Sequence, residues 1–186
     1  MQLTNTRNSY GWLAIALPWI VVIVIAVMLT TGFQAEFAGD AGDREARRAL
    51  MMLHISIGGA FALVMLVRVL SSYLQPRPAP VEQKQPFKFL ASSTHQLLLL
   101  GILIQVISGP LAVWSGGRPL NLFDVFAIPS PFTERIESVH EIAELMHAIG
   151  RWMLIVLISL HVLAVLKHAF VDRDGVMRRM LAPTKA

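Results

Sequence analysis

The 186-residue chain is 55% hydrophobic and has a mean hydropathy of +0.59, which separates it from ordinary soluble domains. It contains no cysteine, so disulfides, thiolate metal ligands, iron–sulfur clusters and c-type haem attachment are excluded. A net charge of +4 with a pI near 10 would be compatible with a protein that binds nucleic acid. The basic residues flank apolar segments, however, and this pattern indicates a membrane protein instead.

Uncharged runs predict where the chain crosses the membrane. A crossing needs about 20 apolar residues, and charges are absent from 8–35, 49–67 and 89–117. A fourth run is shorter, so its helix has to include terminal cationic residues, whose long side chains reach the interface. We therefore predict an all-α integral membrane four-helix bundle. It forms a single domain over residues 1–186, with helices at about 12–32, 50–73, 91–115 and 138–168.

The first predicted helix is expected to be a retained membrane span and not a signal peptide. Its apolar region of about 20 residues exceeds the usual 7–15, and only Arg7 precedes it. Pro18 lies one to two turns inside this helix. It removes a backbone hydrogen bond and can kink the helix, although membrane helices tolerate proline well.

The second predicted helix carries two ionisable residues, His54 and Arg68, 14 positions apart. Fourteen residues rise about 21 Å and return to within about 40° of the starting direction. Both residues therefore lie on one side of the helix, near opposite ends. An ionisable residue inside a membrane helix is a functional candidate; for Arg68 the alternative is snorkelling to the interface. Gly58 and Gly59 leave room beside His54 for a flat ligand or for a close neighbouring helix.

The last two predicted helices carry the other membrane histidines. The proline-rich segment 74–90 is an extended connection, and His95 follows it near the start of the third helix. In the fourth helix, His147 and His161 are again 14 residues apart. They therefore project from one face at two depths and meet the same neighbouring helices.

The distribution of lysine and arginine predicts the orientation. Ten of the 16 basic residues lie on the face that holds both termini and the proline-rich connection, and six lie on the other. We predict a multi-pass membrane protein with both termini in the cytoplasm. His54 and His147 then lie near the outer face, and His95 and His161 near the inner face.

Histidines at matching depth on two helices suggest a haem-iron site. A single membrane histidine is often only a packing residue, but His54 and His147 can approach from opposite sides. They would supply the two axial nitrogens of a b-type haem. A lone metal ion fits less well, because no carboxylate or thiolate accompanies the pair. The sequence contains no P-loop, dinucleotide fingerprint or nucleophile elbow.

Taken together, these features resemble the bacterial cytochrome b561 family, which is related to the cytochrome b subunits of nickel hydrogenases and formate dehydrogenases. The resemblance spans nearly the whole chain. It rests on LHISIGG with Arg68 beyond it, His95 ahead of SGPLAVW, SGGRPLNLFDVFAIP, the spacing of His147 and His161, and LKHAFVDRDGVMRRM. It implies a multi-pass protein of the bacterial inner (plasma) membrane that holds haem b and passes electrons between a periplasmic donor and the quinone pool. Some relatives oxidise superoxide and reduce quinone.

The resemblance also implies a set of haem ligands. A helix-two and a helix-four histidine hold the outer haem in the family, which maps to His54 and His147. His161 and a helix-one histidine would hold the inner haem. Here Pro18 stands where the helix-one histidine is expected, and no histidine precedes His54. Three outcomes stay open for the inner site: no haem, a five-coordinate haem on His161, or His95 as a substitute ligand.

The implied partners are membrane lipid, quinone (ubiquinone as a substrate) and a periplasmic redox partner or partner subunit, with no nucleic acid. Arg68 is a candidate contact for a haem propionate or for quinone. Two functions stay open beside a purely structural membrane protein. One is a quinone-linked oxidoreductase similar to superoxide oxidase. The other is a haem-binding sensor, carrier or membrane-anchor subunit with a degenerate inner haem site.

Overall fold

The computed structural model describes residues 2–7, 9–76, 78, 85 and 87–181. Within them, four long helices are apolar enough to cross a membrane, and the predicted all-α membrane bundle is confirmed. These helices are α1 (Trp12–Asp40), α2 (Arg44–Leu74), α3 (Phe87–Ser115) and α4 (Glu137–Lys167). The shorter elements are β1 (Leu120–Leu122), β2 (Phe126–Ile128), the π-helical turn η1 (His168–Asp172) and α5 (Val176–Leu181).

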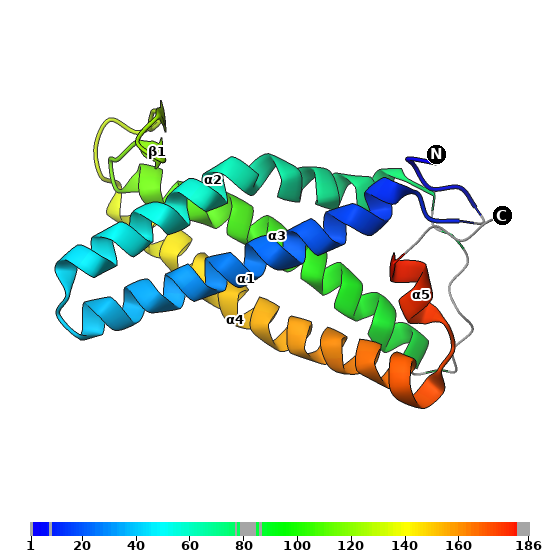
Figure 1. The fold of residues 1–186 in the computed structure, drawn as a ribbon. Helices are drawn as coiled ribbons and strands as arrows, with labels where there is room; N and C mark the ends of the chain where they lie inside the picture. The colour runs from blue at the N-terminus through cyan, green and yellow to red at the C-terminus, as the bar shows by residue number, and fades with distance from the viewer. Residues whose placement is uncertain (1, 8, 77, 79–84, 86, 182–186) are drawn as a thin grey trace.

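The long helices form two antiparallel hairpins, α1–α2 and α3–α4, which cross each other (Figure 1). We call the end that carries the α1–α2 turn and the two strands the hairpin end, and the opposite end the terminal end. Residues from all four helices meet in a core. Its fully buried members are Val21, Val24, Met65, Val69, Leu99, Ile102 and Leu154. Because both hairpins contribute to this core, it holds the two halves in one bundle.

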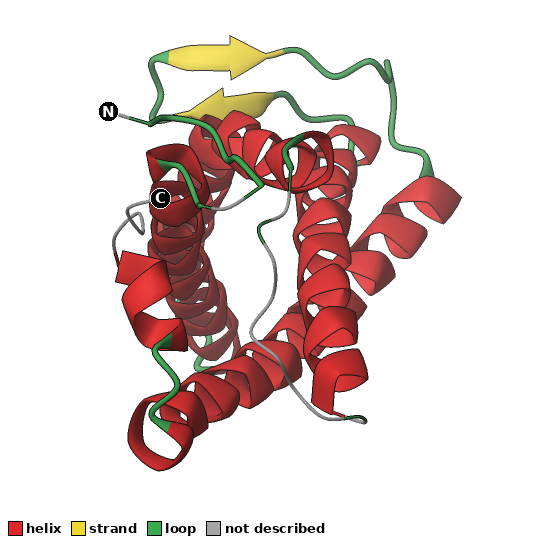
Figure 2. Cartoon of the chain, turned by 90° about the vertical axis from the view of Figure 1, so that its right-hand side faces the viewer, coloured by secondary structure: helices red, strands yellow, loops and turns green. Residues whose placement is uncertain are grey.

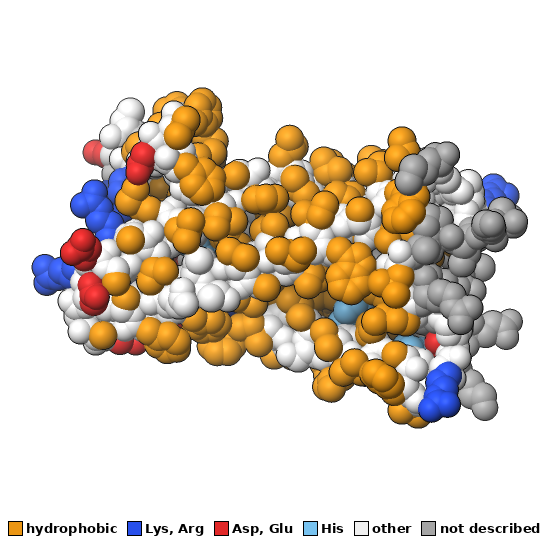
Figure 3. Space-filling model, in the orientation of Figure 1, with side chains coloured by type: hydrophobic (Ala, Val, Ile, Leu, Met, Phe, Trp, Pro, Cys, Tyr) orange, Lys and Arg blue, Asp and Glu red, His pale blue; other side chains and the backbone are white. Residues whose placement is uncertain are grey.

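Most large apolar side chains of the bundle point outward. Apolar side chains cover the middle of the molecule, and the charged ones gather near its ends (Figure 3). Leu63 of α2, for example, is 70% exposed, and Leu163 of α4 is 63% exposed. Such a surface is unfavourable in water, but it matches the hydrocarbon of a bilayer.

The first two helices are longer than their uncharged segments. α1 continues to Asp40 instead of ending near residue 32, and α2 begins at Arg44 instead of near residue 50. Alanine, glutamate and arginine dominate the added turns, and these residues favour helix. Asp43 caps α2 by accepting a hydrogen bond from the Ala46 N–H at 3.0 Å. The α1–α2 connection is therefore a three-residue turn and not a long loop.

In the connection between α3 and α4, a small antiparallel β-hairpin covers one side of the hairpin end (Figure 2). It is fixed to α2 through the buried Ser56. The Phe123 N–H donates to Ser56 Oγ at 2.9 Å, and Ser56 Oγ donates to the Asn121 carbonyl at 3.3 Å. Gly59 lets the strand approach, since a Cβ there would lie 2.5 Å from Leu122 Cδ2. The β-hairpin thus packs on α2 within two turns of His54.

At the terminal end, the short helix α5 folds back toward α1 (Figure 1). The Trp19 indole N–H donates to the Met180 carbonyl at 3.1 Å. Between α4 and α5 the chain reverses at Arg173 and Gly175, both with positive φ. Glycine takes this conformation at no steric cost. These contacts tie the end of the chain to the first membrane helix.

Candidate functional site

The structure places His54 of α2 against His147 of α4, so that each hairpin contributes one histidine. Their ring centres are 6.2 Å apart and the rings are inclined at 75°. Both side chains are half-buried, in the half of the bundle nearer the hairpin end. Two imidazoles from opposite sides of the bundle therefore meet at one depth.

The separation of the two rings suits a shared metal centre. A metal–imidazole bond is about 2 Å long, and the ring centre lies about 1 Å behind the bound nitrogen, so two trans ligands of one iron have ring centres about 6 Å apart. The observed 6.2 Å is close to this value. The separation of the His54 and His147 rings is therefore compatible with a haem iron that both imidazoles would hold.

Hydroxyl groups lie beside the Nδ1 nitrogen of each ring. Thr31 Oγ1 lies 3.1 Å from His54 Nδ1, and Ser108 Oγ lies 3.1 Å from His147 Nδ1. Each hydroxyl donates its own hydrogen to a backbone carbonyl of its helix, at 2.9 Å to Val27 for Thr31 and 2.7 Å to Ile104 for Ser108. Each hydroxyl oxygen can therefore accept a hydrogen bond from a protonated Nδ1 of the neighbouring ring.

The Thr31 hydroxyl favours the tautomer of His54 that carries its proton on Nδ1, and the Ser108 hydroxyl does the same for His147, whose Nδ1 also lies 2.9 Å from the side-chain amide of Gln105. When Nδ1 carries the proton and donates to a hydroxyl, the lone pair of Nε2 is left to bind a metal. A hydrogen bond from the second nitrogen also fixes the orientation of a ligating ring and raises its basicity. Sequence reasoning missed Thr31 and Ser108, because a hydroxyl in a membrane helix more often bonds only to its own backbone.

A glycine follows each of these hydroxyl residues and allows the ring to come close. A Cβ on Gly32 would lie 3.4 Å from His54 Cε1, and a Cβ on Gly109 would lie 3.3 Å from His147 Cε1. The two hairpins therefore repeat one device, in which a hydroxyl residue and a glycine on the first helix support a histidine on the second. In the sequence, the two pairs Thr31–Gly32 and Ser108–Gly109 are the features that could have indicated these contacts with the histidines.

Two buried N–H donors in this half of the bundle have no acceptor among the described residues, Trp114 Nε1 and Arg151 Nε. Buried donors without acceptors are uncommon in proteins. The two propionates of a haem are acceptors of the kind that would satisfy them. The donor set and the unpartnered N–H groups thus both agree with a haem in this half of the bundle.

Arg151 lies one turn beyond His147 on the same face of α4 and reaches α1. Its Nη1 donates to Glu36 Oε2 at 2.8 Å. The guanidinium carbon lies 4.9 Å from the centre of the Phe33 ring and 5.6 Å from that of Trp152. This group fixes a cation between the first and last membrane helices.

The two histidines nearer the terminal end are arranged differently. His161 of α4 and His95 of α3 have ring centres 5.2 Å apart, about 1 Å less than two trans ligands of one iron need. Their helices belong to the same hairpin and pack closely, since a Cβ on Gly101 would lie 2.7 Å from Leu154 Cδ2. Pro18 lies within α1. His95 and His161 therefore lie side by side on two neighbouring helices of one hairpin. His54 and His147, by contrast, come from different hairpins.

Arg68 lies on α2, 14 residues beyond His54 and toward the terminal end. Its side chain is half-buried, and no carboxylate of the described residues forms an ion pair with it. A half-buried cation without a counter-ion at this depth stays a candidate contact for an anionic or carbonyl group.

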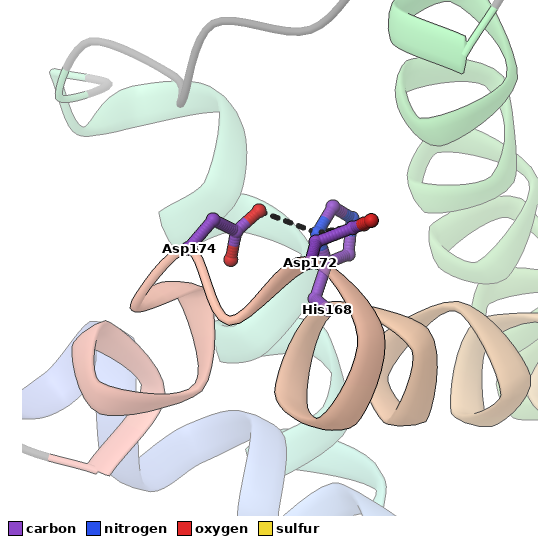
Figure 4. A group of neighbouring side chains, drawn as sticks. All are labelled: His168, Asp172 and Asp174. Carbon is purple, nitrogen blue, oxygen red and sulfur yellow. Dashed lines mark hydrogen bonds and ion pairs between the residues drawn. The ribbon is translucent and has the colours of Figure 1, made fainter.

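A polar cluster follows α4 at the terminal end of the bundle (Figure 4). His168 Nδ1 lies 2.6 Å from Asp174 Oδ2 and 3.3 Å from Asp172 Oδ2, and the Lys167 ammonium lies 2.8 Å from Asp172 Oδ1. These three ring and carboxylate groups could ligate a metal ion. Because the imidazole and Lys167 already partner both carboxylates, we interpret the cluster as the polar end of the helix.

His140, which the sequence analysis did not single out, is buried near the start of α4. Its Nδ1 lies 2.9 Å from the Ala112 carbonyl of α3, and its Nε2 lies 3.2 Å from Glu144 Oε1. Both ring nitrogens thus face acceptors, so neither is available to a metal. We assign His140 to the packing of α4 on α3.

Comparisons with known proteins match the chain over nearly its whole length. The family model for prokaryotic cytochrome b561 matches residues 9–183. "Cytochrome b561 homolog 2" of Escherichia coli (strain K12) is 29% identical over 189 residues, covering 100% of this chain and 98% of that protein. "Probable superoxide oxidase CybB" of Yersinia pestis is 25% identical over 177 residues, covering 94% of this chain and 97% of that protein.

Proposed function

The chain belongs to the prokaryotic cytochrome b561 family of membrane haem proteins that transfer electrons, and from this premise we propose that His54 and His147 are the axial ligands of one haem b. The observation that carries this assignment is the pair of rings 6.2 Å apart, each held at Nδ1 by a hydroxyl oxygen. Thr31 and Ser108 orient the two imidazoles and leave both Nε2 atoms for the iron.

The haem would supply one-electron chemistry, and the protein would set its environment. Two neutral imidazoles are ligands that favour low-spin electron transfer over the binding of a small molecule, because they fill both axial positions. The apolar helices keep bulk water from the middle of the bundle. The chain's own residues thus bind, orient and insulate the redox centre.

We further propose that the inner half holds no second bis-histidine haem. No histidine precedes His54, so α1 offers His161 no imidazole partner. His95 comes from a helix packed directly on α4, which leaves no gap for a porphyrin between the two rings. Arg68, His95 and His161 instead form a polar region near the terminal end, where a quinone carbonyl would find hydrogen-bond donors.

In this proposal, electrons pass from a donor at the hairpin end to quinone at the terminal end. The excess of Lys and Arg near the termini supports a cytoplasmic location for that end and an inner-membrane location for the protein. The printed name of the Yersinia pestis relative makes superoxide the first donor to test. The overall function is then that of a quinone-linked oxidoreductase.

A second candidate is a haem-binding sensor or carrier, or the anchor subunit of a larger enzyme. The observation in its favour is Pro18, since the chain lacks the helix-one histidine that a second haem would need. Addition of superoxide or of a quinol to the purified haem protein separates the two. Rapid reduction of the haem supports the oxidoreductase, and an unreactive haem supports the alternative.

The ligand assignment is tested with His54→Ala, His147→Ala and, as a control, His95→Ala. We expect the first two variants to lose the low-spin haem spectrum, because bis-imidazole ligation of the iron would need both histidines. His95→Ala should retain it. A low-spin spectrum that survives in both ligand variants, or that is lost in His95→Ala, would contradict the assignment.

A further inference from the structure

We propose that Arg151 and Glu36 form an ion pair that sets the reduction potential of the haem held by His54 and His147. The inference rests on the proposed haem site and adds to it two residues that are not ligands. Arg151 raises the potential, and Glu36 offsets part of this effect. They act through charge and position and contact neither the iron nor a substrate.

The first observation is the position of Arg151. It follows His147 by four residues, so the two side chains leave the same face of α4. Its guanidinium packs on Phe33 of α1, the residue next to Gly32, whose backbone lies against the His54 ring. A permanent cation beside both axial ligands is also beside any iron that they share.

The second observation is that the cation is held in place. Glu36 of α1 binds one terminal nitrogen, and the Phe33 and Trp152 rings flank the guanidinium. Only 23% of the Arg151 side chain is exposed, against 50% for Glu36. Arginine stays charged in such surroundings, so the site keeps a fixed positive charge that solvent screens less than the carboxylate opposite.

The third observation concerns the place of the pair in the fold. Arg151 and Glu36 join α4 to α1, and therefore join the two hairpins that contribute His147 and His54. The Arg151 Nε is buried and has no acceptor among the described residues. Part of the Arg151 guanidinium is therefore buried inside the bundle, unlike that of an ion pair that lies wholly on the surface. This position is consistent with an effect on a group inside the bundle.

The expected sign follows from the charge of the iron. Reduction adds one negative charge to the haem, so a nearby cation stabilises the reduced form and a nearby anion destabilises it. A unit charge about 10 Å from a redox centre, in a medium with an effective dielectric constant of about 20, changes its equilibrium by on the order of tenfold. For a one-electron couple, a tenfold change corresponds to about 59 mV.

The test is potentiometric titration of the haem in purified holoprotein carrying Arg151→Gln, Arg151→Lys or Glu36→Gln. We expect Arg151→Gln to lower the midpoint potential and Glu36→Gln to raise it by a smaller amount. Arg151→Lys, which keeps the charge, should stay near the original value. Haem content and the low-spin spectrum are measured on the same samples.

Opposite shifts from the two neutral substitutions are the decisive result. Simple loosening of the α1–α4 contact would move the potential in the same direction in both variants, and that outcome would overturn the inference. Unchanged potentials would also overturn it. Glu36 is half-exposed, so Glu36→Gln is expected to fold. Its midpoint potential therefore tests the inference even if Arg151→Gln does not fold. Failure of the haem site itself would appear separately, as retained low-spin haem in His54→Ala and His147→Ala.

Discussion

The ring centres of His54 and His147 lie 6.2 Å apart, and each ring meets a hydroxyl oxygen from the other helix of its own hairpin. The two helical hairpins thus contribute equivalent halves of one site. Thr31 supports His54 from α1, and Ser108 supports His147 from α3. The site therefore forms where the two hairpins cross, because each hairpin contributes one histidine and one hydroxyl residue.

Removal of the hydroxyl acceptors should weaken haem binding without abolishing it. Thr31→Val and Ser108→Ala each remove the hydroxyl that lies 3.1 Å from the Nδ1 of a ring, and loss of such an outer contact typically costs about 10- to 100-fold in affinity for the metal group. The measurement is the rate at which haem transfers to an excess of apomyoglobin.

The controls for this experiment are Thr30→Val and Ser159→Ala. Thr30 and Ser159 are exposed, and their hydroxyls donate to the carbonyls of Ala26 and Ile155 on their own helices. Their loss should leave haem transfer unchanged. Equal acceleration in the test and control variants would show that the hydroxyls beside the rings have no special role.

Adding a methyl group beside either ring should displace it. Gly109→Ala places a Cβ 3.3 Å from His147 Cε1, which is tighter than an ordinary contact, and we expect a lower haem content in the purified protein. Gly39→Ala is the matched control, because its Cβ meets only the stem of Arg47 at 3.0 Å, which can move into solvent. Normal haem content in Gly109→Ala would indicate that the ring has room to spare.

The β-hairpin should loosen when Ser56 is replaced by alanine. The substitution leaves the Phe123 N–H and the Asn121 carbonyl without the partner they share, at a cost of about 1–3 kcal/mol for a buried group. Hydrogen exchange in residues 120–128 should become faster in Ser56→Ala. Haem content should not change, since Ser56 does not contact either histidine; slower or unaltered exchange would argue against this anchoring role.

Arg68→Gln should slow quinone reduction and leave the haem intact. Its half-buried cation lies in the polar region proposed for quinone, away from the His54–His147 pair. Steady-state kinetics with varied quinone should show a higher KM, while the haem spectrum stays as in the unaltered protein. Arg7→Gln is the control, because Arg7 lies at the same terminal end of the bundle but outside the membrane helices. An unchanged KM in Arg68→Gln would remove this residue from the quinone proposal.

The sequence predicted the four helices because hydropathy and length control membrane crossing directly. It also predicted that His54 and His147 would lie at one depth, since the spacing to Arg68 and His161 fixes where each lies along its helix. It did not predict the roles of Thr31 and Ser108, which depend on which helix packs beside which. The β-hairpin was missed because three-residue strands anchored by one serine leave no periodic pattern.

Haem stoichiometry combined with spin state tests the central claim most directly. A pyridine-haemochrome assay on purified, haem-replete protein should give a haem-to-chain ratio near one, and electron paramagnetic resonance should show a single low-spin bis-histidine species. A ratio near two, with two low-spin species, would contradict the account, because it would require a second pair of axial ligands in the inner half of the bundle.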